Sequence, residues 1–172
     1  GKEVTGKDLS KVVSKVKGEK GTTVELTVLR GEDAKEVTVT ATRDTVQAQT
    51  IEYKMMDDKI GYIRVSEFDT VTYDQYKEAL DDLEKQGMTG LVVDLRNNPG
   101  GSLSTVCDML DLMLPKGLIV YTEDKNGKKT EMKSDEEHQF TKPLAVLVNG
   151  NSASASEIYS GAIQDYGIGK IV

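Results

Sequence analysis

The sequence has little of the material from which metal sites, disulfides and membrane spans are made. Its 172 residues include one cysteine, Cys107, and one histidine, His138, which excludes an internal disulfide, a cysteine-rich zinc site and a multi-histidine metal cage. No stretch approaches the ~20 consecutive apolar residues that cross a bilayer. The opening residues Gly1-Lys2-Glu3-Val4 do not resemble a signal peptide. We therefore expect a soluble chain that binds no metal and carries no address of its own.

Positive charge is also scarce. The 29 acidic residues outnumber the 22 basic ones and give a net charge of -7, which argues against a phosphate-binding surface and hence against nucleic acid as a partner. The hydrophobic share of 37% is enough for a globular core. A length of 172 residues allows one full domain and part of another.

The amino-terminal part of the chain has the pattern of a short helix followed by a hairpin. Lys7–Lys17 spaces its apolar residues along one face of a helix. The segments Thr23–Arg30 and Lys35–Thr42 alternate apolar and polar residues around the turn Gly31-Glu32-Asp33-Ala34. A helix and a hairpin are too small to form a domain alone, so we expect further strands upstream of Gly1.

The remainder of the chain alternates strands with helices, as α/β domains do. Residues 43–58 have weak periodicity and predict the passage between two domains, which we place at 1–45 and 46–172. Strand, helix and strand in succession imply a parallel pair, and the pattern then repeats. The predicted strands are Ile60–Ser66, Gly90–Leu95, Leu118–Tyr121 and Leu144–Asn149, and the predicted helices are Asp74–Lys85, Leu103–Leu114 and Ser154–Tyr166.

Two turns rich in small residues each follow a buried strand and precede a helix. They are Asn97-Asn98-Pro99-Gly100-Gly101 and Asn149-Gly150-Asn151-Ser152-Ala153-Ser154, and both lie where α/β sheets place their ligands. A helix start offers free backbone N–H groups that can stabilise an oxyanion, so a serine there can act as a nucleophile. Such residues are also good helix caps, and on physical grounds alone capping is the commoner role. We interpret Asp94 and Arg96 as an ion pair that shapes the first turn.

These turns carry a family resemblance. The run Val93-Asp94-Leu95-Arg96-Asn97-Asn98-Pro99-Gly100-Gly101, followed by Val146-Leu147-Val148-Asn149 and Ser152-Ala153-Ser154-Ala155-Ser156-Glu157-Ile158, resembles the paired signature of the C-terminal processing (tail-specific) peptidases. Ile60–Val65 is similar to the first core strand of that family, and residues 1–42 are similar to the second half of its PDZ domain. The resemblance implies an α/β fold, a ClpP/crotonase-like core of mixed sheet plus helices preceded by a partial PDZ domain.

The resemblance also implies roles for individual residues. The family's nucleophile is the middle serine of Ser-Ala-Ser-Ala-Ser, which here is Ser154, with Ser152 and Ser156 as its structural neighbours. The backbone N–H groups of Ala155 and Gly101 would form the oxyanion hole. No metal and no organic cofactor is implied.

The base that activates the serine is a separate question. The family uses a lysine whose pKa is lowered by burial, roughly two dozen residues after the serine in a Gly-Lys-Gly context, which falls beyond Val172. Lys170 matches the strand before that lysine, so we interpret it as structural. His138 lies in a segment typical of a solvated loop, and Ser14-x-x-Lys17 lies on a surface helix without a glycine turn. The chain as given is therefore expected to lack peptidase activity.

The predicted function is that of a serine endopeptidase that cleaves proteins or peptides near unstructured C-terminal tails, which a PDZ domain recognises. The alternative is a non-catalytic PDZ-type scaffold that only holds such tails, and a lysine just past Val172 would decide between the two. An acyl-thioester enzyme of the crotonase type is a further rival, against which the Ser-Ala-Ser-Ala-Ser run argues. Unpaired sheet edges favour a homo-oligomer. Family habit suggests an extracytoplasmic location, secreted or anchored to a bacterial membrane.

Overall fold

The computed structural model describes residues 3–45, 47–135 and 137–172, which fall into two compact units. The first unit extends to Gln47, and the second runs from Ala48 to Val172. The predicted domain boundary lies between residues 45 and 46, and Val46 is outside the described residues. The assignment of the first unit to a PDZ domain stays a prediction.

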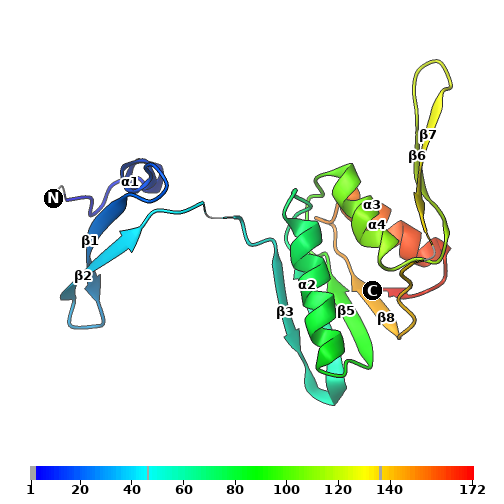
Figure 1. Ribbon diagram of the computed structural model, residues 1–172, viewed down its shortest axis with the longest axis horizontal. Helices are drawn as coiled ribbons and strands as arrows, with labels where there is room; N and C mark the ends of the chain where they lie inside the picture. Colours follow the sequence, from blue (N-terminus) through cyan, green and yellow to red (C-terminus); the bar gives the residue numbers. More distant parts are fainter. Residues whose placement is uncertain (1–2, 46, 136) are drawn as a thin grey trace. The chain divides into compact units, whose positions relative to one another are not determined.

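In the first unit a short helix precedes an antiparallel hairpin (Figure 1). The helix α1 spans Leu9–Val16, and the Asp8 carboxylate caps it by accepting a hydrogen bond from a backbone N–H of the first turn at 2.9 Å. The strands β1 (Thr23–Arg30) and β2 (Lys35–Thr42) have the predicted bounds. The helix is shorter than the predicted Lys7–Lys17 because Asp8 takes the cap position.

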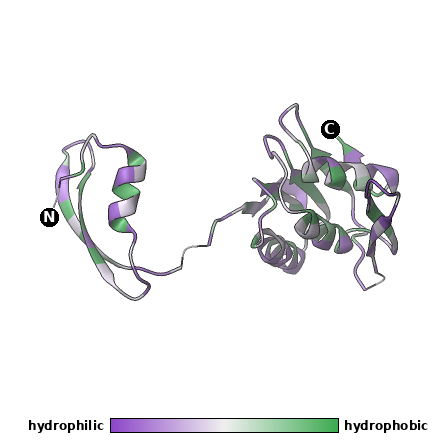
Figure 2. Ribbon diagram, turned by 90° about the horizontal axis from the view of Figure 1, so that it is seen from above, coloured by the Kyte–Doolittle hydropathy of each residue, from purple (hydrophilic) through white to green (hydrophobic). Residues whose placement is uncertain are grey.

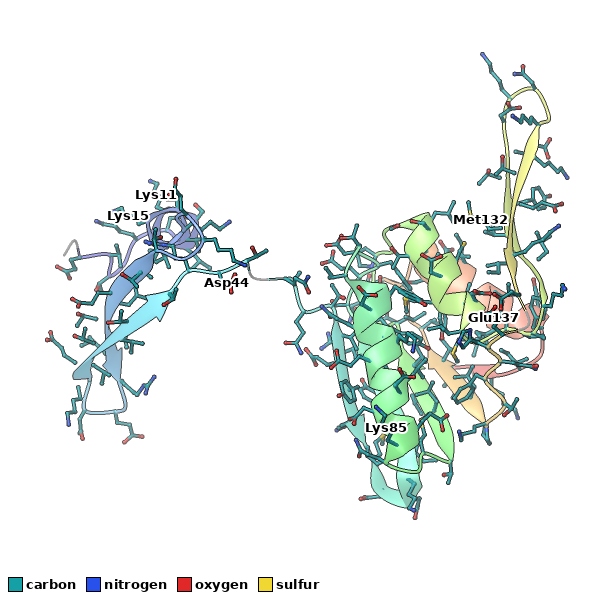
Figure 3. All side chains as sticks on the ribbon, viewed as in Figure 1. Lys11, Lys15, Asp44, Lys85, Met132 and Glu137 are labelled. Atoms are coloured by element: carbon teal, nitrogen blue, oxygen red, sulfur yellow. The ribbon has the colours of Figure 1, made fainter. Side chains whose placement is uncertain are left out.

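Arg43 ties the helix to the hairpin. Its guanidinium donates to the carbonyl of Val16 at 2.7 Å and to a carbonyl of β1 at 2.9 Å. None of the described residues of this unit is buried, although hydrophobic residues occur along both α1 and the strands (Figure 2). Lys11 and Lys15, one turn apart, extend from the same side of α1 (Figure 3). The described residues of this unit therefore contain no buried hydrophobic core.

The second unit is built on a five-stranded sheet in the order β3-β4-β5-β8-β9. β3 runs antiparallel to β4, and the other neighbouring strands are parallel. The predicted fold class, a mixed sheet with helices, is confirmed. The strands are β3 (Ile51–Met55), β4 (Ile60–Val65), β5 (Gly90–Asp94), β8 (Leu144–Leu147) and β9 (Lys170–Ile171), and the 3-10 turn η1 (Asp57–Lys59) joins the first two.

The helices α2 (Thr72–Lys85), α3 (Leu103–Asp111) and α4 (Ala155–Asp165) cover one face of this sheet (Figure 1). Each helix lies on a connection between parallel strands that step in the same direction across the sheet. Because such connections are right-handed, the helices all fall on the same side. α3 ends before the predicted Leu114, which remains buried in the turn that follows.

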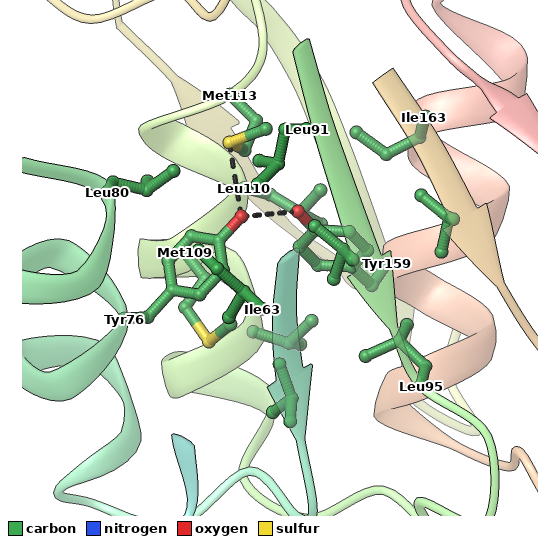
Figure 4. Packing of buried hydrophobic residues seen from close by; sticks show 14 of the residues in the cluster. Ile63, Tyr76, Leu80, Leu91, Leu95, Met109, Leu110, Met113, Tyr159 and Ile163 are labelled. Carbon is green, nitrogen blue, oxygen red and sulfur yellow. Dashed lines mark hydrogen bonds between the residues drawn. The ribbon is translucent and has the colours of Figure 1, made fainter. Parts of the chain in front are cut away.

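The core lies between these helices and the sheet. Alternate residues of the central strands face the helices, among them Ile63, Val93 and Val146, which have no exposed surface. Tyr76 of α2 and Tyr159 of α4 meet within the core with their hydroxyls 2.8 Å apart and their rings edge to face at 6.5 Å (Figure 4). Each hydroxyl thereby finds a partner in an apolar environment.

Between α3 and β8 the chain leaves the sheet as an antiparallel hairpin of β6 (Gly117–Glu123) and β7 (Lys129–Ser134), which projects from the unit (Figure 1). The predicted strand Leu118–Tyr121 is confirmed as β6. It does not continue the strand-helix repeat of the main sheet, because β6 pairs with β7 and the sheet resumes at β8. Met132 of β7 is labelled in Figure 3. Its sulfur atom lies 3.3 Å from that of Cys107 in α3. Most of β7 is exposed, so its sequence is polar.

Candidate active site

The two turns singled out in the sequence lie together at one edge of the sheet. β5 and β8 are parallel neighbours, with Asp94 opposite Leu147, so the turns that follow them leave the sheet at the same edge. Residues 97–101 lead from β5 toward α3, and residues 149–154 lead from β8 into α4.

Hydrogen bonds from asparagine side chains connect the two turns. The Asn149 side chain accepts a hydrogen bond from the Asn97 N–H and donates one to Asn97 Oδ1, each at 3.0 Å. Asn151 Nδ2 donates to the same Oδ1 at 2.9 Å. The two turns therefore form one hydrogen-bonded structure.

Ser154 is the N-cap of α4 and has a backbone conformation that L-residues rarely adopt. Its φ is 54° and its ψ is -116°. Such a conformation costs about 1–3 kcal/mol and persists only where the surroundings impose it, most often at functional sites. Glu157 helps to impose it, since its carboxylate accepts a hydrogen bond from the Ser154 N–H at 2.6 Å. The result is an exposed serine held at the N-terminus of a helix.

The two flanking serines are engaged in the interior of the turns. The Ser152 hydroxyl donates to the carbonyl of Leu95 at 2.8 Å and accepts from the Asn149 N–H at 3.0 Å. Ser156 is fully buried, and its hydroxyl donates to the carbonyl of Asn98 at 3.0 Å. Both hydroxyls therefore have structural partners, in agreement with the structural roles predicted for them.

Glycines 100 and 101 allow the first turn to approach its neighbours closely. Both have positive φ, 105° and 142°. A methyl group on Gly100 would lie 2.7 Å from the Cβ of Ser154 and 3.0 Å from the nitrogen of Ala155. A methyl group on Gly101 would lie 2.2 Å from the carbonyl oxygen of Phe68. Only glycine fits at either position.

The turns also present free backbone donors. Phe68 donates to the carbonyl of Gly100 at 2.9 Å and accepts from the Ser102 N–H at 2.7 Å, and this parallel pairing turns the N–H of Gly101 away from Phe68. Ala155 is the first residue of α4, so its N–H has no partner within the helix. Over residues 3–45, 47–135 and 137–172, neither of these two N–H groups donates a hydrogen bond.

Asp94 and Arg96 form the ion pair that the sequence predicts. The Arg96 side chain donates to both carboxylate oxygens, with the shortest contact at 2.6 Å, and the Tyr62 hydroxyl donates at 2.6 Å. Burial of Asp94 raises its pKa, but the hydrogen bonds from Arg96 and Tyr62 outweigh that effect and lower the pKa to about 2. The ion pair lines a shallow hollow of about 270 Å³ beside Asn97 and Asn149. The carboxylate therefore stays charged and fixes the start of the first turn.

The other candidate residues lie elsewhere. Lys170 is exposed in β9 opposite Ala145, at the start of β8 rather than at the end that leads to Ser154. His138 is exposed and borders a hollow beside α2. Ser14 lies in α1 of the first unit, where its hydroxyl donates to a helix carbonyl at 3.0 Å. The prediction that Lys170 belongs to a strand is confirmed.

The described part of the chain contains neither a metal-binding cluster nor a membrane-spanning helix. It contains no group of three or more histidine, cysteine, aspartate or glutamate residues arranged to hold a metal ion. No helix within it has the length and apolar character of a membrane span.

Sequence reasoning missed Asn98, which is fully buried at the centre of the two turns. The available signal was its place two residues before Gly100, because an asparagine side chain can accept a hydrogen bond from the N–H two residues on. The positive φ of Ser154 was also missed, since nothing in a serine demands it.

Comparison with known proteins gives a consistent result. Residues 59–172 match peptidase family S41. The chain is 38% identical over 166 residues to the carboxy-terminal processing protease CtpA of Bacillus subtilis, covering 96% of this chain and 35% of that protein. It is 37% identical over 161 residues to the carboxyl-terminal-processing protease of Synechocystis, covering 91% and 38%. The chain thus spans about a third of the length of these relatives.

A solved structure of a C-terminal processing protease also matches the chain. The photosystem II D1 C-terminal processing protease superposes with a TM-score of 0.65 at 29% identity, covering 99% of this chain and 48% of that one. The similarity therefore extends over both units of the chain.

Proposed function

The chain belongs to peptidase family S41, and on that premise we propose that it carries the nucleophile of a C-terminal processing protease, Ser154. The observation that carries this assignment is the contrast among three serines in one turn. The hydroxyls of Ser152 and Ser156 donate hydrogen bonds to the backbone carbonyls of Leu95 and Asn98. Ser154, in contrast, is exposed and has a strained backbone conformation at the start of a helix. Strain of this kind is retained where function requires it.

The proposed reaction begins with attack of Ser154 Oγ on a peptide carbonyl carbon, while a base removes the hydroxyl proton. Negative charge then develops on the carbonyl oxygen, and the N–H groups of Gly101 and Ala155 donate to it. Collapse of the intermediate breaks the C–N bond, and the proton passes from the base to the leaving amine. Water, activated by the same base, hydrolyses the resulting ester and restores the serine.

We assign the base to a lysine that follows Val172 in the full-length protein. β9 runs parallel to β8, and the Val148 N–H donates to the carbonyl of Val172 at 2.9 Å. The carboxyl end of β9 is thus directed toward the edge of the sheet that holds Ser154. A neutral lysine there would complete a serine/lysine dyad. A protein limited to residues 1–172 would lack this lysine and is expected to turn over no substrate.

The proposed substrates are proteins with unstructured C-terminal tails, in line with the processing named for the relatives. Residues 1–45 would belong to a PDZ domain that recognises those tails, and 46–172 to the catalytic core. Unpaired sheet edges favour a homo-oligomer. An extracytoplasmic location, secreted or anchored to a bacterial membrane, completes the proposal. A scaffold that only holds tails remains the competing function.

Covalent labelling tests the proposal. The full-length protein is treated with a fluorophosphonate, which reacts with activated serines, and the adduct is located by mass spectrometry of peptides spanning 149–166. We expect one phosphonylated residue, Ser154, and no label in Ser154→Ala. A protein that stays unlabelled while fully folded would favour the scaffold, and a label on Ser152 would refute the assignment of the nucleophile.

A further inference from the structure

Asn98 is buried at the junction of the two turns, although its neighbours Asn97 and Pro99 are exposed. Its side chain bridges two segments: Nδ2 donates to the carbonyl of Val65 at the end of β4 at 2.9 Å, and Oδ1 accepts from the Gly100 N–H at 2.8 Å. Because the buried side chain keeps both hydrogen bonds, its position is fixed, and it fixes the turn of residues 97–101 in turn.

The backbone carbonyl of Asn98 holds the second turn. It accepts from the Ala153 N–H at 3.1 Å and from the Ser156 hydroxyl at 3.0 Å. These two donors lie immediately before and two residues after Ser154. Asn98 therefore contacts both turns. Its side chain holds the turn of residues 97–101, and its carbonyl accepts hydrogen bonds from residues on both sides of Ser154.

We propose that Asn98 is a positioning residue, which sets the distance between Ser154 and the N–H of Gly101 that would stabilise the oxyanion. This inference rests on the proposed function. Gly101 follows the N–H that the Asn98 side chain anchors, and Ser154 lies between the two groups that the Asn98 carbonyl anchors. A displacement of about 1 Å between reacting groups can cost about 10²-fold in rate, so loss of this anchor should act on the chemical step.

A buried asparagine also stabilises a turn, and the experiment must separate the two effects. Ser134 offers a matched control, because it is also a buried polar residue but lies at the base of the β6–β7 hairpin. Its hydroxyl donates to the carbonyl of Pro115 at 2.6 Å. Ser134→Ala should lower the Tm without changing kcat.

The test compares kcat and KM of the full-length protein and its variants on an unstructured peptide, at a temperature where circular dichroism shows each variant folded. For Asn98→Ala we expect kcat to fall by about 10²-fold with KM within about threefold, since the lost anchor moves the oxyanion donor and not the rest of the binding surface. A kcat within about threefold of wild type in folded Asn98→Ala would overturn the proposal.

Asn98→Asp is the second variant, to be used if Asn98→Ala does not fold. It also makes the effect on kcat depend on pH. The aspartate keeps an acceptor for the Gly100 N–H, but its second oxygen opposes the Val65 carbonyl until it is protonated. The ratio of variant to wild-type kcat should therefore be low at neutral pH and rise as pH falls, whereas a constant ratio near one would refute the positioning role. Ser154→Ala keeps the two claims apart. If Ser154→Ala retains turnover the proposed function fails, and if it is inactive while both Asn98 variants keep kcat, only the positioning role fails.

Discussion

Gly100 and Ser154 are packed so closely that a methyl group on the glycine would lie 2.7 Å from the Cβ of the serine. The same methyl group would lie 2.8 Å from the carbonyl oxygen of Ala153. The turn after β5 therefore fits against the turn after β8 only while position 100 has no side chain, and the geometry around Ser154 depends on both turns.

Gly100→Ala should lower both stability and activity. The added methyl group meets backbone and Cβ atoms that cannot yield, and alanine at a φ of 105° adds strain of about 1–3 kcal/mol. Gly150→Ala is the control within the same pair of turns, because its methyl group would meet nothing within 4 Å and its φ is not positive. Thermal unfolding and peptide turnover of the two variants check this; equal effects would contradict the packing described.

Ser152→Ala and Ser156→Ala should each cost about 1 kcal/mol of stability through a lost hydrogen bond. Ser156→Ala should cost the more, since its hydroxyl is fully buried. Neither variant should abolish turnover, because both hydroxyls point to carbonyls of the protein. Urea unfolding measures the first effect. Complete loss of activity in a well-folded Ser152→Ala would show that a structural role is the wrong interpretation.

The Asp94–Arg96 pair should stabilise the protein above pH 4 and cease to do so at acid pH. The pKa of Asp94 is lowered from 3.8 to about 2, so the folded state favours the charged carboxylate. That stabilisation is present above the unfolded pKa and is lost as pH falls toward 2. Asp94→Asn should therefore have a lower Tm than wild type at pH 6, by an amount equivalent to about 1–2 kcal/mol. The gap between the two Tm values should narrow from pH 4 downward; a gap independent of pH would contradict the ion pair.

The buried tyrosine pair should show coupling in a double-mutant cycle. Tyr159→Phe leaves the Tyr76 hydroxyl with only the sulfur of Met113, 3.3 Å away, and should cost about 1–3 kcal/mol. The double variant Tyr76→Phe/Tyr159→Phe removes both hydroxyls, so it should cost less than the sum of the single changes. Strict additivity in urea unfolding would mean that the 2.8 Å contact contributes nothing.

The fold was predictable where apolar and polar residues recur at the spacing of a strand or a helix. The hairpin of β1 and β2 alternates apolar and polar residues around a turn, and its bounds were predicted without error. β3 was missed although Ile51, Tyr53 and Met55 alternate with charged residues, because the segment is short and lies beside a domain boundary. β7 carries no such alternation, since most of it faces solvent, and β9 has only two residues.

The location of the site was predictable from the sequence, but the hydrogen bonds that position its residues were not. Glycine and asparagine after one buried strand, and serine after the next, indicate turns that converge at one sheet edge. Which serine is exposed depends on hydrogen bonds between residues far apart in sequence, such as Ser152 to Leu95 and Ser156 to Asn98. The burial of Asn98 has the same origin, because it depends on β4 lying beside the turn.

The most direct test of the account is turnover by Ser154→Ala in the full-length protein, measured with the Tm of the same sample. Removal of Oγ keeps the hydrogen bond from the Ser154 N–H to Glu157 and loses only the hydroxyl's part of the capping box, so the Tm should fall by no more than the loss of one N-cap, about 1 kcal/mol, would cause. Cleavage of an unstructured peptide should fall by at least about 10⁴-fold, because the covalent route is gone. Near-normal turnover in Ser154→Ala would contradict the account, and the nucleophile would have to lie elsewhere.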